Sequence, residues 1–296
     1  MKKQQPIIEI SNLCKNYGKE RGITNINLEV YEGEMFGFIG PNGAGKSTTI
    51  RTMLNFLFPT SGEVKIFGLD SIKDSVLIKE NIGYVPSEVN YYDYMKVKDL
   101  LLYAASFSKT VDIKRIDELC KEFDLKKDKK ISELSFGNKK KVSIIQALLH
   151  KPKLLILDEP TNGLDPLMQK KLFDVLKRAQ VQGATIFLSS HNLSEVEKYC
   201  DRVGVVKDGI IVDIKDVSII NHSSSKKVII KTSKELKIKV KGISEIEYKN
   251  DEYHFNFDGQ INELLMALSK CEVDDITVLP LSLEDDFLRY YGGNER

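Results

Sequence analysis

Residues 40–48 read GPNGAGKST, a glycine-rich turn that ends in a lysine and a hydroxyl residue. Gly40, Gly43 and Gly45 can adopt positive φ, so consecutive backbone N–H groups can point at phosphate oxygens with no Cβ in the way. The apolar run at 35–40 predicts a strand leading into the turn, and the residues from Lys46 onward predict a helix whose positive end faces an anion. We therefore interpret the stretch as a phosphate-binding loop for a nucleotide, in place of an ordinary glycine-rich turn.

The same loop supplies the residues expected to hold the phosphates and a metal. Lys46 reaches the β and γ phosphates as a point charge, and Ser47 offers its hydroxyl to a magnesium ion. Every residue of the loop is a candidate for nucleotide contact: Gly40, Pro41, Asn42, Gly43, Ala44, Gly45, Lys46, Ser47 and Thr48.

A second stretch, KLLILDEPTNGLDP at 153–166, predicts a pair of carboxylates beside this loop. Residues 154–157 form a short continuous apolar run, which is typical of a parallel strand buried on both faces. Asp158 and Glu159 follow at its carboxyl end, where ligands bind in open α/β sheets. A carboxylate at Asp158 suits a magnesium shell, and one at Glu159 suits polarisation of an attacking water. Taken alone, the segment would be a strand that ends in a solvated acidic turn.

With both stretches in this order, residues 6 to about 215 resemble the ABC-type ATPases. The resemblance implies ATP and Mg²⁺ as cofactors, with Asp158 binding the metal and Glu159 acting in catalysis. It implies that Tyr17, in LCKNYG, stacks on adenine. It also implies that His191, after FLSS, is a switch histidine that contacts the γ-phosphate. Taken alone, Tyr17 would be a packed aromatic and His191 a residue at the start of a helix.

LSFGN at 134–138 stands where this family has the signature LSGGQ. In the family's dimers the signature closes over the γ-phosphate bound by the partner chain. The resemblance therefore implies partner-chain ATP contacts from Ser135 and Gly137, and from Asp165 in the D-loop Gly163-Leu164-Asp165.

The chain departs from the family pattern at two places. Where the family usually has Gln after YVP, this chain has Ser87, whose shorter side chain cannot span the same distance to a metal. Either Glu88 substitutes or a water bridges from Ser87. In the signature, Phe136 replaces a glycine and Asn138 replaces Gln, while the serine and the second glycine remain. We expect the phosphate grip to survive, because a serine hydroxyl and a glycine N–H at a helix start are suited to it.

Three lysines, Lys139 to Lys141, follow the signature at once. Such a charge run is usually a solvated face, although here it would raise the positive potential near the nucleotide. Together with Ser87, this signature resembles that of the multidrug or peptide-antibiotic branch of bacterial ABC exporters.

Composition agrees with a cytosolic enzyme. The 296 residues suffice for one α/β domain and a smaller second one, and a net charge of +1 gives no argument for a nucleic-acid partner. Four cysteines without CxxC spacing predict reduced thiols: Cys14, Cys120, Cys200 and Cys271. We find no signal peptide and no run of about 18 apolar residues, the length of a membrane-spanning helix. We therefore expect the chain at the cytoplasmic face of the cell membrane, held there by a separate permease.

The predicted fold is an α/β, ABC-type P-loop ATPase domain at 1–220, followed by a small α+β domain at 221–296. The first domain has an antiparallel β layer before the phosphate loop and a helical insert at about 86–150, with apolar residues at helical spacing from Pro86 to about Ile131. Strands that alternate with helices after the insert predict a parallel sheet.

A polar, serine-rich linker, NHSSSKK at 221–227, precedes the second domain. KVIIKT, ISEIEYK, EYHFNF and DDITVLP predict strands, and NELLMALSK and SLEDDFLRYYGG predict helices. His254 lies in a β-patterned segment and is interpreted as a packing residue, not a ligand. We favour a dimerisation role for this domain over ligand sensing.

The preferred function is ATP hydrolysis that drives export through a separate integral membrane subunit. Two copies, or one copy and a similar ATPase, would dimerise head to tail around the nucleotide. The alternative is a non-hydrolysing, nucleotide-gated interaction protein: the altered residues Ser87, Phe136 and Asn138 motivate it, whereas Glu159 and His191 argue against it. A soluble ABC protein acting on nucleic acid or ribosomes fits less well, because neither a second ATPase half nor a long coiled coil is present.

An aromatic loop in the insert bears on the membrane partner. Tyr91, Tyr92 and Tyr94 either form part of a groove for a coupling helix of the permease or cover the insert's own core.

Overall fold

The computed structural model describes residues 5–18, 20–108, 112–218, 225–234, 236, 238 and 240–280. The chain divides into two compact units, Met1–Lys215 and Asp216–Arg296, and each is described by itself. This division falls slightly before the expected boundary at 220/221.

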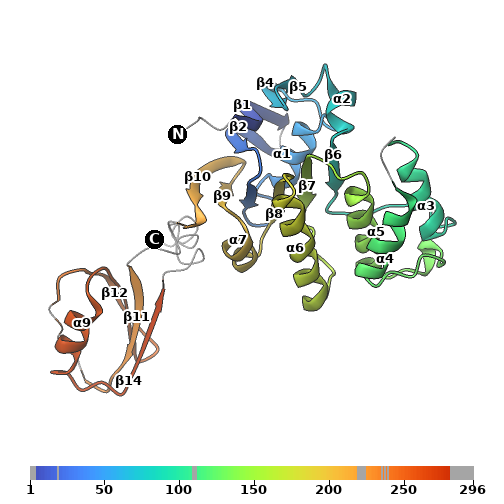
Figure 1. Cartoon of the computed structure of the whole chain (residues 1–296). Helices are drawn as coiled ribbons and strands as arrows, with labels where there is room; N and C mark the ends of the chain where they lie inside the picture. The colour runs from blue at the N-terminus through green and yellow to red at the C-terminus, as the bar shows by residue number, and fades with distance from the viewer. Residues whose placement is uncertain are drawn as a thin grey trace. The chain divides into compact units, whose positions relative to one another are not determined.

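A six-stranded sheet forms the centre of the first unit, in the order β10-β9-β3-β8-β7-β6 (Figure 1). Its strands are β3 (Met35–Ile39), β6 (Ile82–Val85), β7 (Leu154–Asp158), β8 (Thr185–Ser190), β9 (Arg202–Lys207) and β10 (Ile210–Asp216). Every residue of β3, β7 and β8 is buried, as expected of parallel strands covered on both faces. Ile39 pairs with Ser190, and Asp158 pairs with Ser189, so the carboxyl ends of these three strands meet at one edge.

An antiparallel layer packs over one face of this sheet, as predicted. It runs β2-β1-β4-β5, with β1 at Pro6–Tyr17, β2 at Glu20–Tyr31, β4 at Ser61–Ile66 and β5 at Leu69–Asp70. Helix α1 (Lys46–Met53) lies between the two layers (Figure 1). A shared apolar core joins Ile8 of β1, Ile50 of α1 and Phe187 of β8, and thereby fixes where the phosphate loop lies.

Two helices cover the other face of the sheet: α6 (Pro166–Val181) and α7 (Leu193–Tyr199). Successive side chains of β3 point to opposite faces of the sheet. Phe36 and Phe38 belong to the core with α1, whereas a Cβ at Gly37 would lie 2.5 Å from Val196 of α7. The glycine lets α7 approach the strand closely.

The helical insert consists of α3 (Val97–Ala105), α4 (Ile113–Glu122), the 3-10 turn η1 (Ile131–Glu133) and α5 (Phe136–Leu148), whereas the short helix α2 (Ser75–Lys79) precedes β6. The expectation of helix from Pro86 onward is wrong for its first part. Residues 86–96 form a loop that ends at Lys96, which has extended φ and ψ and bridges to Lys130. Pro86 cannot donate to a ladder or a helix, and α3 begins only where regular apolar spacing begins.

In its described residues, the second unit contains a four-stranded antiparallel sheet in the order β12-β13-β11-β14 and the helix α9 (Ile261–Leu268). The strands are β11 (Lys226–Lys231), β12 (Ile243–Lys249), β13 (Glu252–Phe257) and β14 (Asp275–Pro280), in agreement with the α+β prediction. Its core joins Val228, Phe257 and Leu264. The predicted closing helix SLEDDFLRYYGG and most of the serine-rich linker lie outside the described residues.

No helix in the described parts of the chain combines the length and the apolar character needed to cross a bilayer. All four cysteines are free.

Candidate functional site

The phosphate loop joins the end of β3 to the start of α1. Gly43 and Gly45 have φ of 82° and 105°, in the left-handed region that a side chain would disfavour. Because α1 begins at Lys46, the N–H groups of its first turn face the loop opening and have no partner within the helix. This is the anion-binding geometry expected from the sequence. The expectation of positive φ is wrong at Gly40, where the glycine is needed instead because a Cβ would lie 2.4 Å from the carbonyl oxygen of Val206.

Lys46 is buried at the base of the loop. Its Nζ donates to the carbonyl oxygens of Gly40 at 2.7 Å and Pro41 at 3.2 Å. The ammonium group is therefore held below the glycine turn, where it reaches both the cavity and the carboxylate of Glu159.

A cavity of about 900 Å³ opens above the loop. Its lining includes loop residues Asn42, Gly43, Gly45, Lys46, Ser47 and Thr48, with Ser87, Glu88, Phe136 and Glu159 from other segments. The structure thus brings most of the predicted phosphate contacts together with one of the two predicted acids. Both candidates for the altered position after YVP, Ser87 and Glu88, line the same space.

Asp158 is fully buried at the end of β7. The Ser189 hydroxyl donates to its Oδ1 at 2.6 Å, while Oδ2 has no hydrogen-bond partner among the described residues. A buried carboxylate oxygen without a donor is costly unless a cation or another donor meets it. The residues present therefore fit a Mg²⁺ ion held by Asp158 and Ser47. No cluster of three or more acidic, His or Cys ligands occurs in the described part of the chain.

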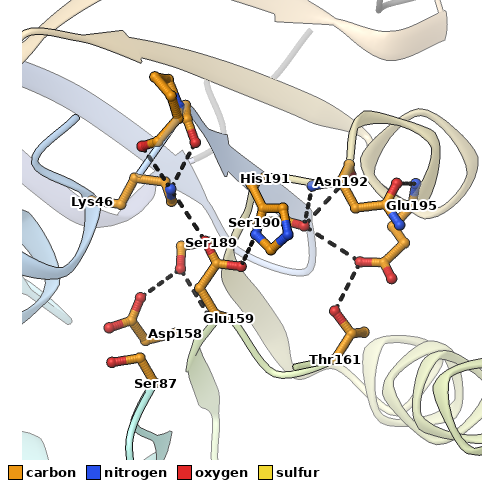
Figure 2. Close-up of polar contacts among 12 residues, drawn as sticks. Lys46, Ser87, Asp158, Glu159, Thr161, Ser189, Ser190, His191, Asn192 and Glu195 are labelled. Atoms are coloured by element: carbon orange, nitrogen blue, oxygen red, sulfur yellow. Dashed lines mark hydrogen bonds and ion pairs between the residues drawn. The ribbon is translucent and has the colours of Figure 1, made fainter. Parts of the chain in front are cut away.

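Glu159 lies between a lysine and a histidine. Its Oε1 is 3.1 Å from Nζ of Lys46, and its Oε2 is 2.7 Å from Nδ1 of His191 (Figure 2). Its backbone has φ of 48°, a left-handed conformation rare outside glycine, and its N–H donates to the hydroxyl of Ser189 at 3.0 Å. Strained backbone of this kind clusters at functional sites, and here it directs the carboxylate into the cavity.

His191 follows β8 and keeps half of its side chain exposed. The contact with the Glu159 carboxylate places a proton on Nδ1 and leaves Nε2 available to a ligand. Asn192 caps α7 just beyond it, by accepting from the N–H of Glu195 at 3.4 Å. The structure thus places His191 beside Glu159, and its contact with the γ-phosphate stays a prediction.

Ser189 and Glu195 are site residues that the sequence interpretation missed. Ser189 contacts both acids, as described above. Glu195 accepts from the hydroxyls of Thr161 at 3.2 Å and Ser190 at 3.4 Å, and burial raises its pKa (Figure 2). The available signal for Ser189 was a hydroxyl on the strand next to that of Asp158, two residues before the switch position.

Ser135 and Gly137 of the signature face a different cavity. Ser135 caps α5, its Oγ accepting from the N–H of Asn138 at 3.4 Å, and its hydroxyl proton remains available to donate. Ser135, Gly137 and Asp165 together line a second cavity of about 410 Å³, whose lining includes no residue of the phosphate loop. The structure therefore keeps the predicted partner-chain contacts apart from the phosphate loop of the same chain.

Phe136, the altered signature residue, packs on the D-loop. A Cβ at Gly163, whose φ is 77°, would lie 2.3 Å from Cδ1 of the Phe136 ring. The ring therefore needs a glycine at 163, and it lines the phosphate-loop cavity on its other side.

The expectation of a solvated lysine run is wrong at Lys140. This side chain has no exposed surface, and its Nζ donates to the carbonyls of Pro86 at 2.8 Å and Ser87 at 3.0 Å. Burial lowers the pKa of Lys140 to about 8, although Asp158 and Glu159 oppose the shift. The reason is helical periodicity, since Lys140 lies on the buried stripe of α5 with Ile144.

Tyr17 ends β1 with 41% of its surface exposed, and Nζ of Lys15 lies 5.4 Å from the ring centroid. It lies outside the lining of the phosphate cavity. Its stacking on adenine stays a prediction.

The three insert tyrosines differ in environment. Tyr91 donates to Oε1 of Gln146 at 2.9 Å, and burial raises its pKa to about 12. Tyr92 is 61% exposed and lines an apolar groove of about 1000 Å³, together with Tyr103 and Phe107. Tyr94 is exposed outside that lining.

Comparison with known proteins places these features in one family. The family described as ABC transporter matches residues 23–162. The bacitracin transport ATP-binding protein BcrA of Bacillus licheniformis is 34% identical over 300 residues, covering 97% of this chain and 98% of the relative.

Solved structures agree. The structure of the ATP-binding subunit of an ABC transporter superposes with a TM-score of 0.68 at 30% sequence identity. The match covers 73% of this chain and 92% of that subunit. A dimeric ATP-binding cassette in a post-hydrolysis state, bound to ADP and Pi, has a TM-score of 0.65 at 25% sequence identity. The match covers 71% of this chain and 98% of that cassette.

Proposed function

Because this chain belongs to the ABC transporter family, as one of its ATP-binding ATPase subunits, we propose that it drives export through a separate membrane subunit. Two copies, or one copy and a similar ATPase, assemble head to tail around two ATP molecules. The proposed site is then completed only in the dimer.

One observation carries the dimer proposal. The phosphate loop lines one cavity, while Ser135 and Gly137 line another. The serine hydroxyl and the glycine N–H at the start of α5 form an anion site with no phosphate source in the same chain. A partner rotated by two-fold symmetry supplies that phosphate and receives the same contact in return.

The chain's own residues divide the work of hydrolysis. Lys46 and the loop N–H groups bind the β and γ phosphates. Glu159 accepts a proton from the water that attacks the γ-phosphorus, while the bond from that phosphorus to the bridging oxygen breaks and ADP leaves. His191 orients the Glu159 carboxylate through the contact at Oε2 and presents Nε2 to the γ-phosphate. Asp158 and Ser47 would hold Mg²⁺, which would supply neutralisation of phosphate charge.

In the same arrangement, the γ-phosphate of ATP competes with the Glu159 carboxylate for Lys46. Its ammonium group is ion-paired with Glu159 at 3.1 Å. A γ-phosphate that attracts Lys46 frees one carboxylate oxygen of Glu159 for water. Nucleotide binding and activation of the base are thereby linked.

The proposed permease contact is the apolar groove at Tyr92. Tyr92, Tyr103 and Phe107 are all more than half exposed on its wall, and large exposed aromatic side chains in one patch favour a protein partner. An amphipathic helix from the membrane subunit, laid into this groove with its apolar face inward, is the partner we propose. This contact would hold the chain at the cytoplasmic face of the membrane.

The substrate proposal rests on the relatives. BcrA is described as a bacitracin transport protein, and it matches both units of this chain. We propose a drug or peptide-antibiotic substrate, selected by the membrane subunit, and a dimer-supporting role for the second unit.

The purified chain tests the proposal in solution. Light scattering of Glu159→Gln with MgATP is expected to give a dimer mass that disappears with ADP. A chain that hydrolyses ATP while remaining monomeric at all protein concentrations would contradict the head-to-tail assembly.

A further inference from the structure

Lys140 is a fully buried lysine just behind the candidate catalytic strand. It is the middle member of the run Lys139 to Lys141, and its two neighbours keep part of their surface exposed. Lys139 instead forms an ion pair with Asp93 at 3.2 Å. A buried lysine that forms no carboxylate ion pair among the described residues calls for an explanation other than surface charge.

The ammonium group is held by carbonyl oxygens. Nζ donates to Pro86 at 2.8 Å, to Ser87 at 3.0 Å and, at a longer 3.5 Å, to the backbone oxygen of Asp158. An ammonium group has three donors and no acceptor, so three carbonyls satisfy it fully. The contact ties α5 to the ends of two neighbouring strands, because β6 pairs with β7 at Val85 and Leu157.

The segment that Lys140 anchors connects two cavities. Residues 87–90 line the cavity above the phosphate loop, and residues 90–92 line the apolar groove. Asn90 belongs to both linings. Segment 87–92 therefore connects the groove wall, within a few residues, to the point where Lys140 meets Asp158.

We propose that Lys140 is a positioning residue for ATP hydrolysis, which fixes the start of segment 87–92 against the strand end that carries Asp158 and Glu159. The inference rests on the proposed function, since it assumes that these two acids act in hydrolysis. It extends that function by assigning a physical link between the acids and the groove. The link is a side chain of α5 and not the side chain of residue 87.

Lys140 makes none of its hydrogen bonds to the phosphate loop. Removal of its charge leaves nucleotide binding by the loop in place and loosens the position of the acids. The expected result is a lower kcat per folded chain with an unchanged affinity for ATP. Loss of folded protein would instead lower the number of ATP molecules bound per chain.

Lys140→Met in the full chain tests this, because methionine is unbranched and fills a buried lysine's space without donors. We expect kcat for ATP to fall at least about tenfold, while the Kd for MgATP changes by less than about twofold. Lys114→Met on α4, an exposed lysine, is the matched control and should leave both unchanged. Lys140→Gln keeps two N–H donors and should give an intermediate kcat.

Amide hydrogen exchange supplies a readout independent of activity. In Lys140→Met, exchange should accelerate at residues 87–92 and stay unchanged in α1, whereas general destabilisation would accelerate both. A folded Lys140→Met protein with the wild-type kcat and wild-type exchange at 87–92 overturns the proposal. If that variant does not fold, Lys140→Gln decides, and wild-type values for it overturn the proposal equally.

These assays use the isolated chain. A wild-type protein that no membrane subunit stimulates would contradict the proposed transport function and leave the Lys140 result standing. A wild-type turnover that Glu159→Gln does not reduce would instead remove the premise of the inference.

Discussion

His191 and Glu159 form a direct pair, with Nδ1 of the ring 2.7 Å from Oε2 of the carboxylate. The two residues lie 32 positions apart on neighbouring parallel strand ends. The other carboxylate oxygen is held by Lys46, so the proposed base is oriented from both sides.

Glu159→Gln should abolish most turnover while leaving nucleotide binding intact. The amide cannot accept the proton of the attacking water, and loss of a general base typically costs about 10²-fold or more. Phosphate release under steady-state conditions measures the effect, and equilibrium binding of ATP measures retention of affinity. Glu118→Gln on the exposed side of α4 is the control. Wild-type turnover in Glu159→Gln would remove Glu159 from the role of base.

His191→Ala should act through the same carboxylate. With its Oε2 partner gone, Glu159 is held by Lys46 alone, and we expect kcat to fall by roughly 10²-fold. Because both residues serve one step, the double variant with Glu159→Gln should be little slower than Glu159→Gln alone. Fully multiplicative losses in this cycle would show that His191 acts independently of Glu159.

The insert tyrosines should separate by environment. Tyr92→Ala removes an exposed ring from the groove and should reduce stimulation by the membrane subunit, with basal ATPase unchanged. Tyr94→Ala, whose ring lies outside the groove lining, should have a smaller effect. Tyr91→Ala loses the hydrogen bond to Gln146 and should lower the melting temperature instead. Equal effects of Tyr92→Ala and Tyr94→Ala on stimulation would argue against the groove as the docking site.

Ser87→Gln should alter stimulation more than basal turnover. If the native serine reaches a metal through a water, that bridge costs on the order of 0–2 kcal/mol, which is too little to stop hydrolysis. The backbone of residue 87 stays anchored by Lys140 in either case. Basal rates of wild type and Ser87→Gln, with and without the membrane subunit, test this. An increase of basal turnover by orders of magnitude would identify the natural protein as an impaired ATPase and favour the nucleotide-gated clamp.

The sequence was sufficient where function depends on local pattern. The phosphate loop needs glycines with positive φ, and the strand before Asp158 needs a continuous apolar run. Both features can be recognised from the sequence alone. The parallel sheet then brings these two strand ends together without further information.

Contacts between distant segments were the part that the sequence did not reveal. In the sequence, Lys140 is interpreted as part of a solvated charge run, although its spacing to Ile144 places it on the buried stripe of α5. For Ser189 the sequence predicts only a place in a strand, because its role depends on the strand register that sets it beside Asp158. The start of α3 was predicted too early, since apolar residues in the preceding loop lie in cavity walls and not on a helix.

Mixing two inactive variants tests the head-to-tail site most directly. Lys46→Ala removes the charged phosphate contact and should weaken nucleotide binding, but it keeps the signature. Ser135→Asp keeps a residue suited to cap α5 and places a carboxylate against the partner's γ-phosphate, while its own phosphate loop is intact. Each variant alone should be nearly inactive.

In an equal mixture, half of the dimers carry one complete site, formed by the loop of one chain and the signature of the other. We predict recovery of up to about a quarter of the wild-type ATPase rate, well above the mean of the two variants measured separately. Wild-type turnover by Ser135→Asp alone, or a mixture no faster than that mean, would contradict the account.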